Sequence, residues 1–184
     1  MTVRKDYLLN GLLRFNYFPM QKKRKAEVPP VFSSSTLSPK IAEKVHNLPL
    51  NKDRKSNGFD SIQYKATRYN NVPRLISLPH PKPYIDLCFE IYQSWDKIKH
   101  ICSNSSSLIR PRKHKDGRIA IMDYETSQAK RNRYYTNAFG KKFLAQADIA
   151  NCYPSLYSHA IPWALVGIDK AKRQRDPTKW FNKL

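Results

Sequence analysis

The sequence predicts an α+β fold that is helix-rich toward its N-terminus. Three patterns along the 184 residues support this prediction. Apolar side chains recur at helical spacing after Pro83, a basic loop around Asp116-Gly117 separates two short apolar stretches, and a short apolar strand occupies Phe143–Ile149. A long helix combined with hairpin and strand elements in separate parts of one chain is typical of the α+β class.

The charge balance indicates a polyanionic partner. The chain has 34 Lys and Arg residues against 14 Asp and Glu, a formal net charge of +20, and cations that bind phosphates release condensed counterions. The three cysteines form no CxxC pair, which argues against a zinc ribbon or a disulfide framework and favours a reducing, cytoplasmic location. No apolar run approaches the roughly 20 residues that cross a bilayer, so we expect no membrane partner.

The first part of the chain predicts one helix and two irregular connections. Leucines and Phe15 recur at helical spacing over residues 8–15, which favours a helix that docks on the protein body over one that lies on a membrane. Residues 28–40 are rich in Pro and Ser and predict an extended connection. Residues 50–58 are polar and predict a loop.

The longest predicted helix covers residues 83–102. Asn70–Pro83 contains four prolines, which exclude a regular helix there. After Pro83 the apolar positions, which include Ile85, Cys88 and Trp95, follow the i, i+3, i+4, i+7 pattern and predict a face buried in the core. The polar run at residues 103–107 predicts its end.

Two basic segments follow this helix. Five of the nine residues from Arg110 to Arg118 are basic, and Asp116-Gly117 predicts a hairpin with a two-residue turn. Such a tip is either a solvated surface or a phosphate contact, and the net charge favours the second. The cluster Lys130–Arg133 precedes two tyrosines, which either stack on nucleic-acid bases or form the edge of a core.

The segment 143–168 holds the candidate chemistry. Its apolar strand ends at Asp148, and a turn and a helix are expected after it. A carboxylate at a strand end can hold a metal ion at a sheet edge, although it is also a common turn or helix-capping residue.

The stretch ADIANCYPSLYSHAIPWAL, residues 147–165, resembles motif A of the bacterial retron-like, abortive-infection and defence-associated reverse transcriptases. Upstream, FNYFP with VPPVFSS, and RYNNVPRLISLPHPKPYIDL, are similar to the N-terminal region of the defence-associated group. The resemblance implies an RNA-directed DNA polymerase of antiviral defence with a partial right-hand fold. Residues 1–69 would be an N-terminal extension with connecting loops, 70–142 the fingers, and 143–184 the start of the palm.

The resemblance also implies roles for single residues. Asp148 matches the aspartate that binds the two catalytic Mg²⁺ ions, and the backbone carbonyl of Ile149 would be a neighbouring oxygen ligand. Tyr153 matches the aromatic steric gate, which excludes the 2′-hydroxyl of a ribonucleotide and so favours dNTPs.

The basic segments acquire roles in the same way. The turn would close over the dNTP triphosphate through Arg112, Lys113, Lys115 and Arg118. The second cluster would contact the backbone of the RNA template and its DNA or RNA primer through Lys130, Arg131 and Arg133.

The sequence also departs from the family pattern. It contains neither an Asp-Asp pair nor a Q-x-x-G-[IL]-P-x-G segment, and it ends at Leu184 near the point where both would follow. We therefore expect an N-terminal part that lacks motifs B and C and is inactive alone, with a second chain as one source of the missing parts. The alternatives are a non-catalytic, basic nucleic-acid-binding module derived from a reverse transcriptase and a ribosomal-type RNA-binding protein.

Overall fold

The computed structural model describes residues 4–18, 31–67, 73–104, 107, 110–121, 125–143, 145 and 155–183. The chain divides into two compact units. The first comprises residues 1–104 and 110–121, and the second comprises residues 105–109 and 122–184. The domain limits expected from the resemblance stay a prediction.

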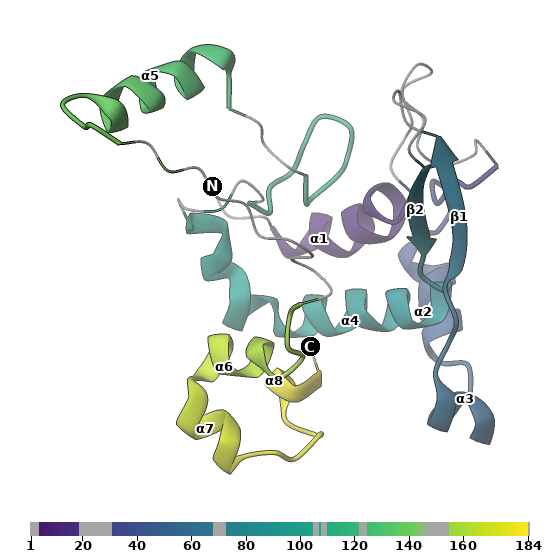
Figure 1. Cartoon of the computed structure of the whole chain (residues 1–184). Coiled ribbons are helices and arrows are strands. Elements are labelled where there is room, and N and C mark those ends of the chain that lie inside the picture. The colour runs from purple at the N-terminus through teal and green to yellow at the C-terminus, as the bar shows by residue number, and fades with distance from the viewer. Residues whose placement is uncertain are drawn as a thin grey trace. The chain divides into compact units, whose positions relative to one another are not determined.

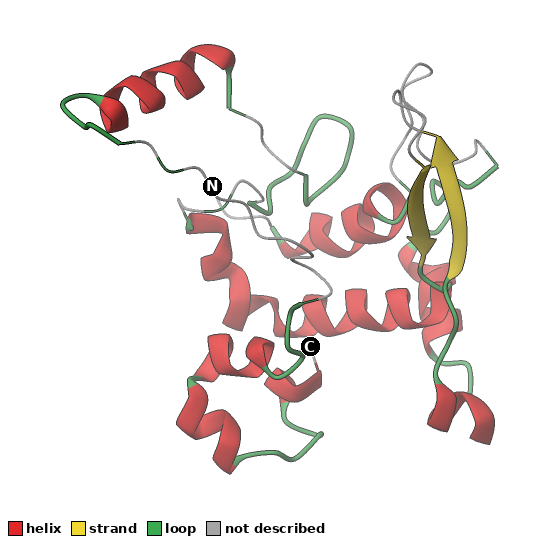
Figure 2. Cartoon of the chain, viewed as in Figure 1, coloured by secondary structure: helices red, strands yellow, loops and turns green. Residues whose placement is uncertain are grey.

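The first unit is mainly helical and contains a small sheet (Figures 1 and 2). Its elements, in chain order, are α1 (Lys5–Gly11), the π-helix η1 (Leu12–Asn16), α2 (Pro39–His46), α3 (Lys52–Asn57), β1 (Ile62–Thr67), β2 (Pro73–Leu78), α4 (Pro81–Ile98) and the 3-10 helix η2 (Lys99–Ser103).

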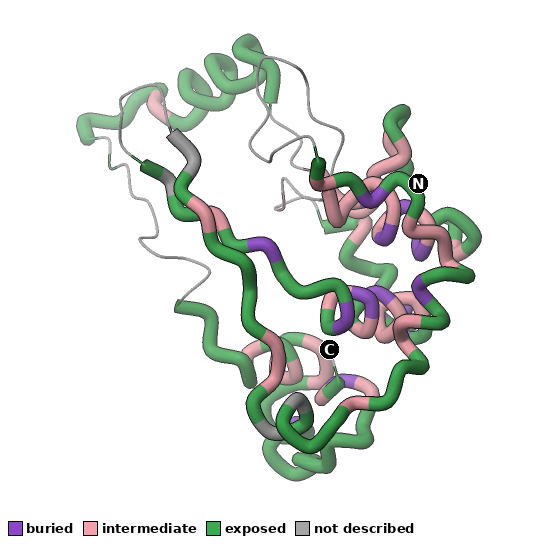
Figure 3. The backbone as a smooth tube through the Cα atoms, turned by 90° about the vertical axis from the view of Figure 1, so that its right-hand side faces the viewer, coloured by how far each residue is buried: buried purple, intermediate pink, exposed green. Residues whose placement is uncertain are grey.

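The core of this unit lies where α1, η1, α2 and α4 meet. Its buried members are Leu9, Leu13, Ala42, Ile85 and Cys88. Most of the described chain is exposed or half-buried, and the buried positions gather on a few helices (Figure 3). The helical periodicity therefore identified the right core face of both the N-terminal helix and the long helix.

The long helix begins two residues earlier than predicted. His80 is its N-cap, with Nδ1 accepting from the backbone N–H of Lys82 at 3.2 Å, and the helix opens with Pro81, which has no N–H to lose. At its other end the chain tightens into η2 after Ile98. Burial raises the pKa of the Cys88 thiol to about 12, in keeping with its place in the core.

A polar cluster ties α2 to α4. Lys82, which is only 7% exposed, has its Nζ 2.7 Å from each carboxylate oxygen of Asp86 and 2.9 Å from the carbonyl of His46. The Nδ1 atom of His46 is itself 2.7 Å from Asp86. The buried ammonium is thus fully compensated, as burial of a charge requires.

The sheet is a two-stranded antiparallel pair that sequence patterning did not predict. Its register pairs Ile62 with Leu78 at one end and Thr67 with Pro73 at the other. The exclusion of a helix over Asn70–Pro83 was correct for residues 73–80 and wrong for 81–83, which open α4. The same prolines obscured a strand. Pro73 is tolerated because it is the first residue of β2 in a sheet that has only edge strands.

Two segments expected to be irregular contain short helices. The polar loop predicted at residues 50–58 contains α3, and the extended connection at 28–40 runs into α2, whose N-cap is Ser38. The Ser38 hydroxyl accepts from the N–H of Ile41 at 3.4 Å. Both helices have fewer than nine residues, too few for a clear apolar period.

Every regular element described in the second unit is a helix. Its elements are α5 (Ser127–Ala138), α6 (Ala160–Val166), α7 (Ile168–Arg173) and α8 (Trp180–Lys183). The predicted strand at residues 143–149 falls mostly outside the described residues. In the described residues of both units the fold is helix-rich with one small sheet, as expected for α+β. Among the described helices none is long and apolar enough to span a membrane.

Candidate nucleic-acid interface

The basic segment of the first unit forms a hairpin-shaped loop. The N–H of Arg112 donates to the carbonyl of Ile119 at 2.8 Å, and the N–H of His114 donates to the carbonyl of Arg118 at 3.0 Å. Residues 115–117, which lie between His114 and Arg118, form a three-residue turn instead of the predicted two-residue turn. Gly117 is the third, with φ at +87°, the conformation that a bulged three-residue hairpin turn needs.

One side chain of the π-helix holds the base of this loop. The amide of Asn16 accepts from the backbone N–H groups of Ile119 at 2.7 Å and Ala120 at 3.2 Å, and it donates to the Ala120 carbonyl at 2.5 Å. The π-helix adds a residue to the last turn and so changes the direction in which this side chain leaves the helix. A loop more than 100 residues away in sequence is thereby fixed to the N-terminal helix.

Close packing complements these hydrogen bonds. Ile119 is 1% exposed and lies against Gly11, where a Cβ atom would overlap its side chain. The ring of Phe15 covers Gly117, and a Cβ there would lie 2.7 Å from the ring. The loop therefore has a rigid base formed by glycines and apolar side chains, with its cations beyond that base.

The predicted triphosphate ligands differ in their surroundings. The ammonium of Lys113 lies 3.7 Å from the centre of the Tyr7 ring, a cation–π contact. Lys115 is exposed at the tip and has no ion-pair partner among the described carboxylates. The guanidinium of Arg118 contacts Asp116 at 2.6 and 2.7 Å, and this contact holds the pKa of that carboxyl below its usual value. An anion bound at Arg118 would therefore compete with Asp116.

The second basic cluster lies on α5, a helix without buried residues. Lys130, Arg131 and Arg133 are all exposed, and the guanidinium of Arg133 contacts Glu125 at 2.6 Å. Tyr134 and Tyr135 are 51% and 66% exposed. Of the two interpretations of these tyrosines, an exposed platform fits and the edge of a core does not, within the part of the chain that is described.

The residues that carry the resemblance to motif A are only partly described. Asp148, Ile149 and Tyr153 lie outside the described residues, so their predicted metal and nucleotide contacts stay predictions. Downstream, the expected helix is present as α6. Within the described ranges, no three His, Cys, Asp or Glu residues form a group that could hold a metal ion.

Sequence reasoning missed the anchoring role of Asn16. A single polar residue at the end of an apolar helix carries no local signal, because its partners follow it by more than 100 residues. The predicted cations of the turn come together on one loop, whereas the predicted cations of α5 belong to the other unit.

No protein-family model, curated protein or solved structure matches this chain.

Proposed function

We propose that this chain serves an RNA-directed DNA polymerase of the bacterial defence type, in which it forms the fingers and the start of the palm. The observation that carries the proposal is the basic turn whose base is pinned to the π-helix by Asn16. The sequence of residues 147–165, with its resemblance to motif A, supports the same assignment.

The turn has the features that closure over a triphosphate requires. Its base is fixed by hydrogen bonds and close packing, while Lys115 at the tip is exposed. Two nitrogens of the Arg118 guanidinium already donate to one carboxylate oxygen of Asp116, so this group is placed to bind an anion at the turn. A nucleotide phosphate that displaced the Asp116 carboxylate from the guanidinium would become the new partner of Arg118. The base of the loop would not have to move.

This sequence supplies too few carboxylate ligands for the two catalytic metal ions. Asp148 and the carbonyl of Ile149 are oxygen donors, the type that Mg²⁺ prefers, but one carboxylate cannot complete octahedral coordination of two ions. The chain contains no Asp-Asp pair to add the missing ligands. We therefore propose that the remaining carboxylates come from further polypeptide, in the same chain or in a second one.

Binding of labelled dTTP with Mg²⁺ to the purified chain tests this role of the turn. The variant Lys115→Gln/Arg118→Gln is expected to weaken dTTP binding at least about tenfold, because it removes charge-assisted hydrogen bonds to phosphate. The variant Lys40→Gln/Lys44→Gln, which removes the same charge from exposed positions of α2, is expected to change binding far less. Equal losses in both variants, or equal affinity for dTTP and dTMP, would contradict the assignment.

A second candidate function is a non-catalytic nucleic-acid-binding module. The exposed tyrosines of α5 beside three cations favour it, because bases stack on aromatic rings while cations bind the phosphates. Such a module binds oligonucleotides but shows no preference for dTTP over dTMP. Both functions require affinity for nucleic acid to fall steeply with salt, so a flat salt dependence would contradict both.

A further inference from the structure

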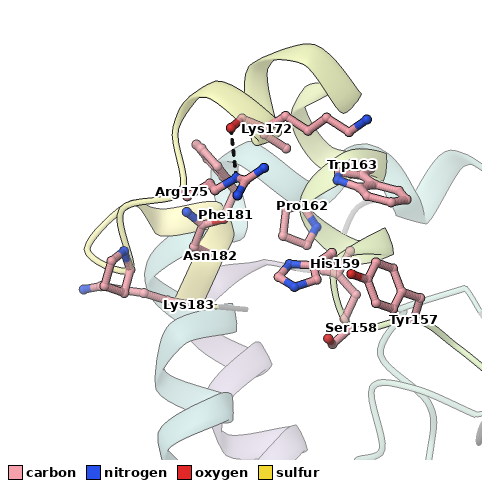
Figure 4. A pocket seen from close by; sticks show the side chains of 13 residues that line it. Tyr157, Ser158, His159, Pro162, Trp163, Lys172, Arg175, Phe181, Asn182 and Lys183 are labelled. Carbon is pink, nitrogen blue, oxygen red and sulfur yellow. Dashed lines mark hydrogen bonds between the residues drawn. The ribbon is translucent and has the colours of Figure 1, made fainter.

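The C-terminal helices enclose a cavity that no predicted site residue lines. It lies within residues 157–183, between α6, α7, α8 and the loop that joins the last two, and its volume is about 700 Å³. That volume falls within the range of roughly 300–1,000 Å³ that small-molecule sites occupy. Figure 4 shows the side chains that surround it.

Local features of the sequence create this cavity. Gly167, with φ at +84°, breaks the chain between α6 and α7 and so allows the two helices to fold back. The side-chain amide of Asn182 donates to the carbonyls of Gln174 at 2.9 Å and Asp176 at 2.7 Å, which fixes the loop after α7 to α8. Phe181, 2% exposed, is a buried part of the lining.

One wall of the cavity is aromatic. The ring centroids of Tyr157 and Trp163 lie 5.5 Å apart, and the ring of His159 lies 5.0 Å from Tyr157. In Figure 4 these three side chains lie together at one side of the cavity. Tyr157 is 58% exposed, so its ring is accessible to a ligand. Exposed rings of this kind accept a planar base by stacking.

The opposite side of the cavity is cationic. Arg175 and Lys183 lie across from the aromatic wall in Figure 4. Lys172 also lines the cavity, but its ammonium ends on the side of Trp163. Among the described residues no carboxylate lines the cavity. Asp176 follows Arg175, but its carboxylate accepts from the backbone N–H and the hydroxyl of Thr178, at 2.8 and 2.7 Å.

Arg175 is oriented for an anion. Its Nε donates to the carbonyl of Lys172 at 3.2 Å, the contact drawn as a dashed line in Figure 4. The terminal nitrogens of the guanidinium have no carboxylate partner in the described part of the chain. A planar cation opposite a wall of tilted aromatic rings suits a ligand that combines a flat base with a phosphate.

We propose that this cavity binds one nucleotide unit of a single-stranded nucleic acid, with the base against Tyr157 and Trp163 and the phosphate on Arg175. A base inside a duplex is stacked on both faces and cannot enter, so the site selects single strands. The same chemistry would accept a free nucleoside monophosphate, and the experiment separates the two sources. The proposal does not rest on the polymerase assignment.

The test is fluorescence anisotropy of a labelled dT 12-mer with the full chain at physiological salt. Arg175→Gln is expected to weaken binding about tenfold relative to Arg173→Gln. Arg173 is the matched control, because it is exposed, carries the same charge, donates through Nε to the carbonyl of Asp169 at 3.3 Å, and does not line the cavity. Equal effects of the two variants would show that Arg175 contributes no more to binding than an arginine outside the cavity. That result would overturn the proposal.

The aromatic wall is tested separately. Tyr157→Leu is expected to weaken binding of the 12-mer by at least about fivefold through loss of stacking, and Trp163→Leu should do the same if circular dichroism shows that the variant remains folded. Unchanged affinity in Tyr157→Leu, or equal affinity for a blunt DNA duplex, would overturn the proposal. Competition by dTMP at the concentration at which the 12-mer binds would support the ligand chemistry and assign the site to free nucleotides.

Failure of this proposal is distinguishable from failure of the polymerase assignment. The cavity variants leave the turn of the first unit unchanged, so dTTP binding that depends on Lys115 and Arg118 persists in them if the polymerase assignment is correct. Conversely, if Arg175→Gln does not weaken binding of the 12-mer, the dependence of dTTP binding on Lys115 and Arg118 is unaffected.

Discussion

Substitution of Asn16 by Ala should loosen the basic loop without unfolding the chain. The side chain makes three hydrogen bonds to the backbone at Ile119 and Ala120. A hydrogen bond of this kind contributes about 0.5–1.5 kcal/mol net, and the site is half-buried, so we expect a loss of about 2–3 kcal/mol for opening of the loop. That loss corresponds to exchange of the Ile119 amide hydrogen that is faster by roughly 30- to 150-fold.

Hydrogen exchange followed by mass spectrometry on peptides from residues 110–121 provides the assay. Asn57→Ala is the matched control, because Asn57 is exposed at the end of α3, and its effect should stay within about 0.5 kcal/mol. Exchange at Ile119 that is unchanged in Asn16→Ala would refute the anchoring role. Faster exchange throughout the chain in both variants would refute it as well.

Three further predictions concern the same unit and its turn. Gly117→Ala should cost at least about 1 kcal/mol more than Gly140→Ala in urea unfolding, since both glycines have positive φ but only the first has an aromatic ring within 4 Å. In Arg118→Gln the pKa of Asp116, measured by NMR titration, should rise toward its usual value. The Arg118–Asp116 contact stabilises the fold above about pH 4. This contribution to stability is lost as the pH falls and Asp116 is protonated. Cys88 should resist iodoacetamide at pH 8.5 until urea is added, because burial raises its pKa to about 12; its contribution to stability is present below about pH 9 and is lost as the pH rises toward 12. Equal costs for the two alanine variants, an unshifted carboxyl titration, or rapid alkylation of the native chain would contradict the respective prediction.

The parts of the fold that were predictable have a strong local signal. The long helix α4 was evident from the spacing of Ile85, Cys88 and Trp95, because a helix repeats its buried face every three or four residues. The strand β2 was not evident, since Pro73 and the prolines after it mask the alternation of a strand. The turn was located by Asp116-Gly117, but its three-residue form depends on pairing across the loop.

The candidate site was predictable only as a set of cations. Charge and the Asp-Gly dipeptide indicated a phosphate-binding turn, but they could not show that Arg118 pairs with Asp116 or that Asn16 fixes the base. The Asn16 anchor arises from contacts between distant segments, which sequence periodicity does not encode. The Arg118–Asp116 pair is local but depends on the conformation of the turn. The cavity of the second unit was missed for a related reason, because Tyr157 and Arg175 lie 18 residues apart and meet only when α6 and α7 fold back.

We propose that the chain contributes to a metal-dependent DNA polymerase through Asp148. Primer extension on a poly(rA) template with an oligo(dT) primer, Mg²⁺ and labelled dTTP tests it most directly, both with the 184-residue chain and with that chain supplemented by a polypeptide that carries a Y-x-D-D motif. We expect no incorporation by the chain alone. We expect incorporation by the completed enzyme, its loss in Asp148→Ala, and its retention in Asp169→Ala, which removes an exposed carboxylate of α7. Incorporation by the chain alone, or full activity of the completed enzyme with Asp148→Ala, would contradict the account.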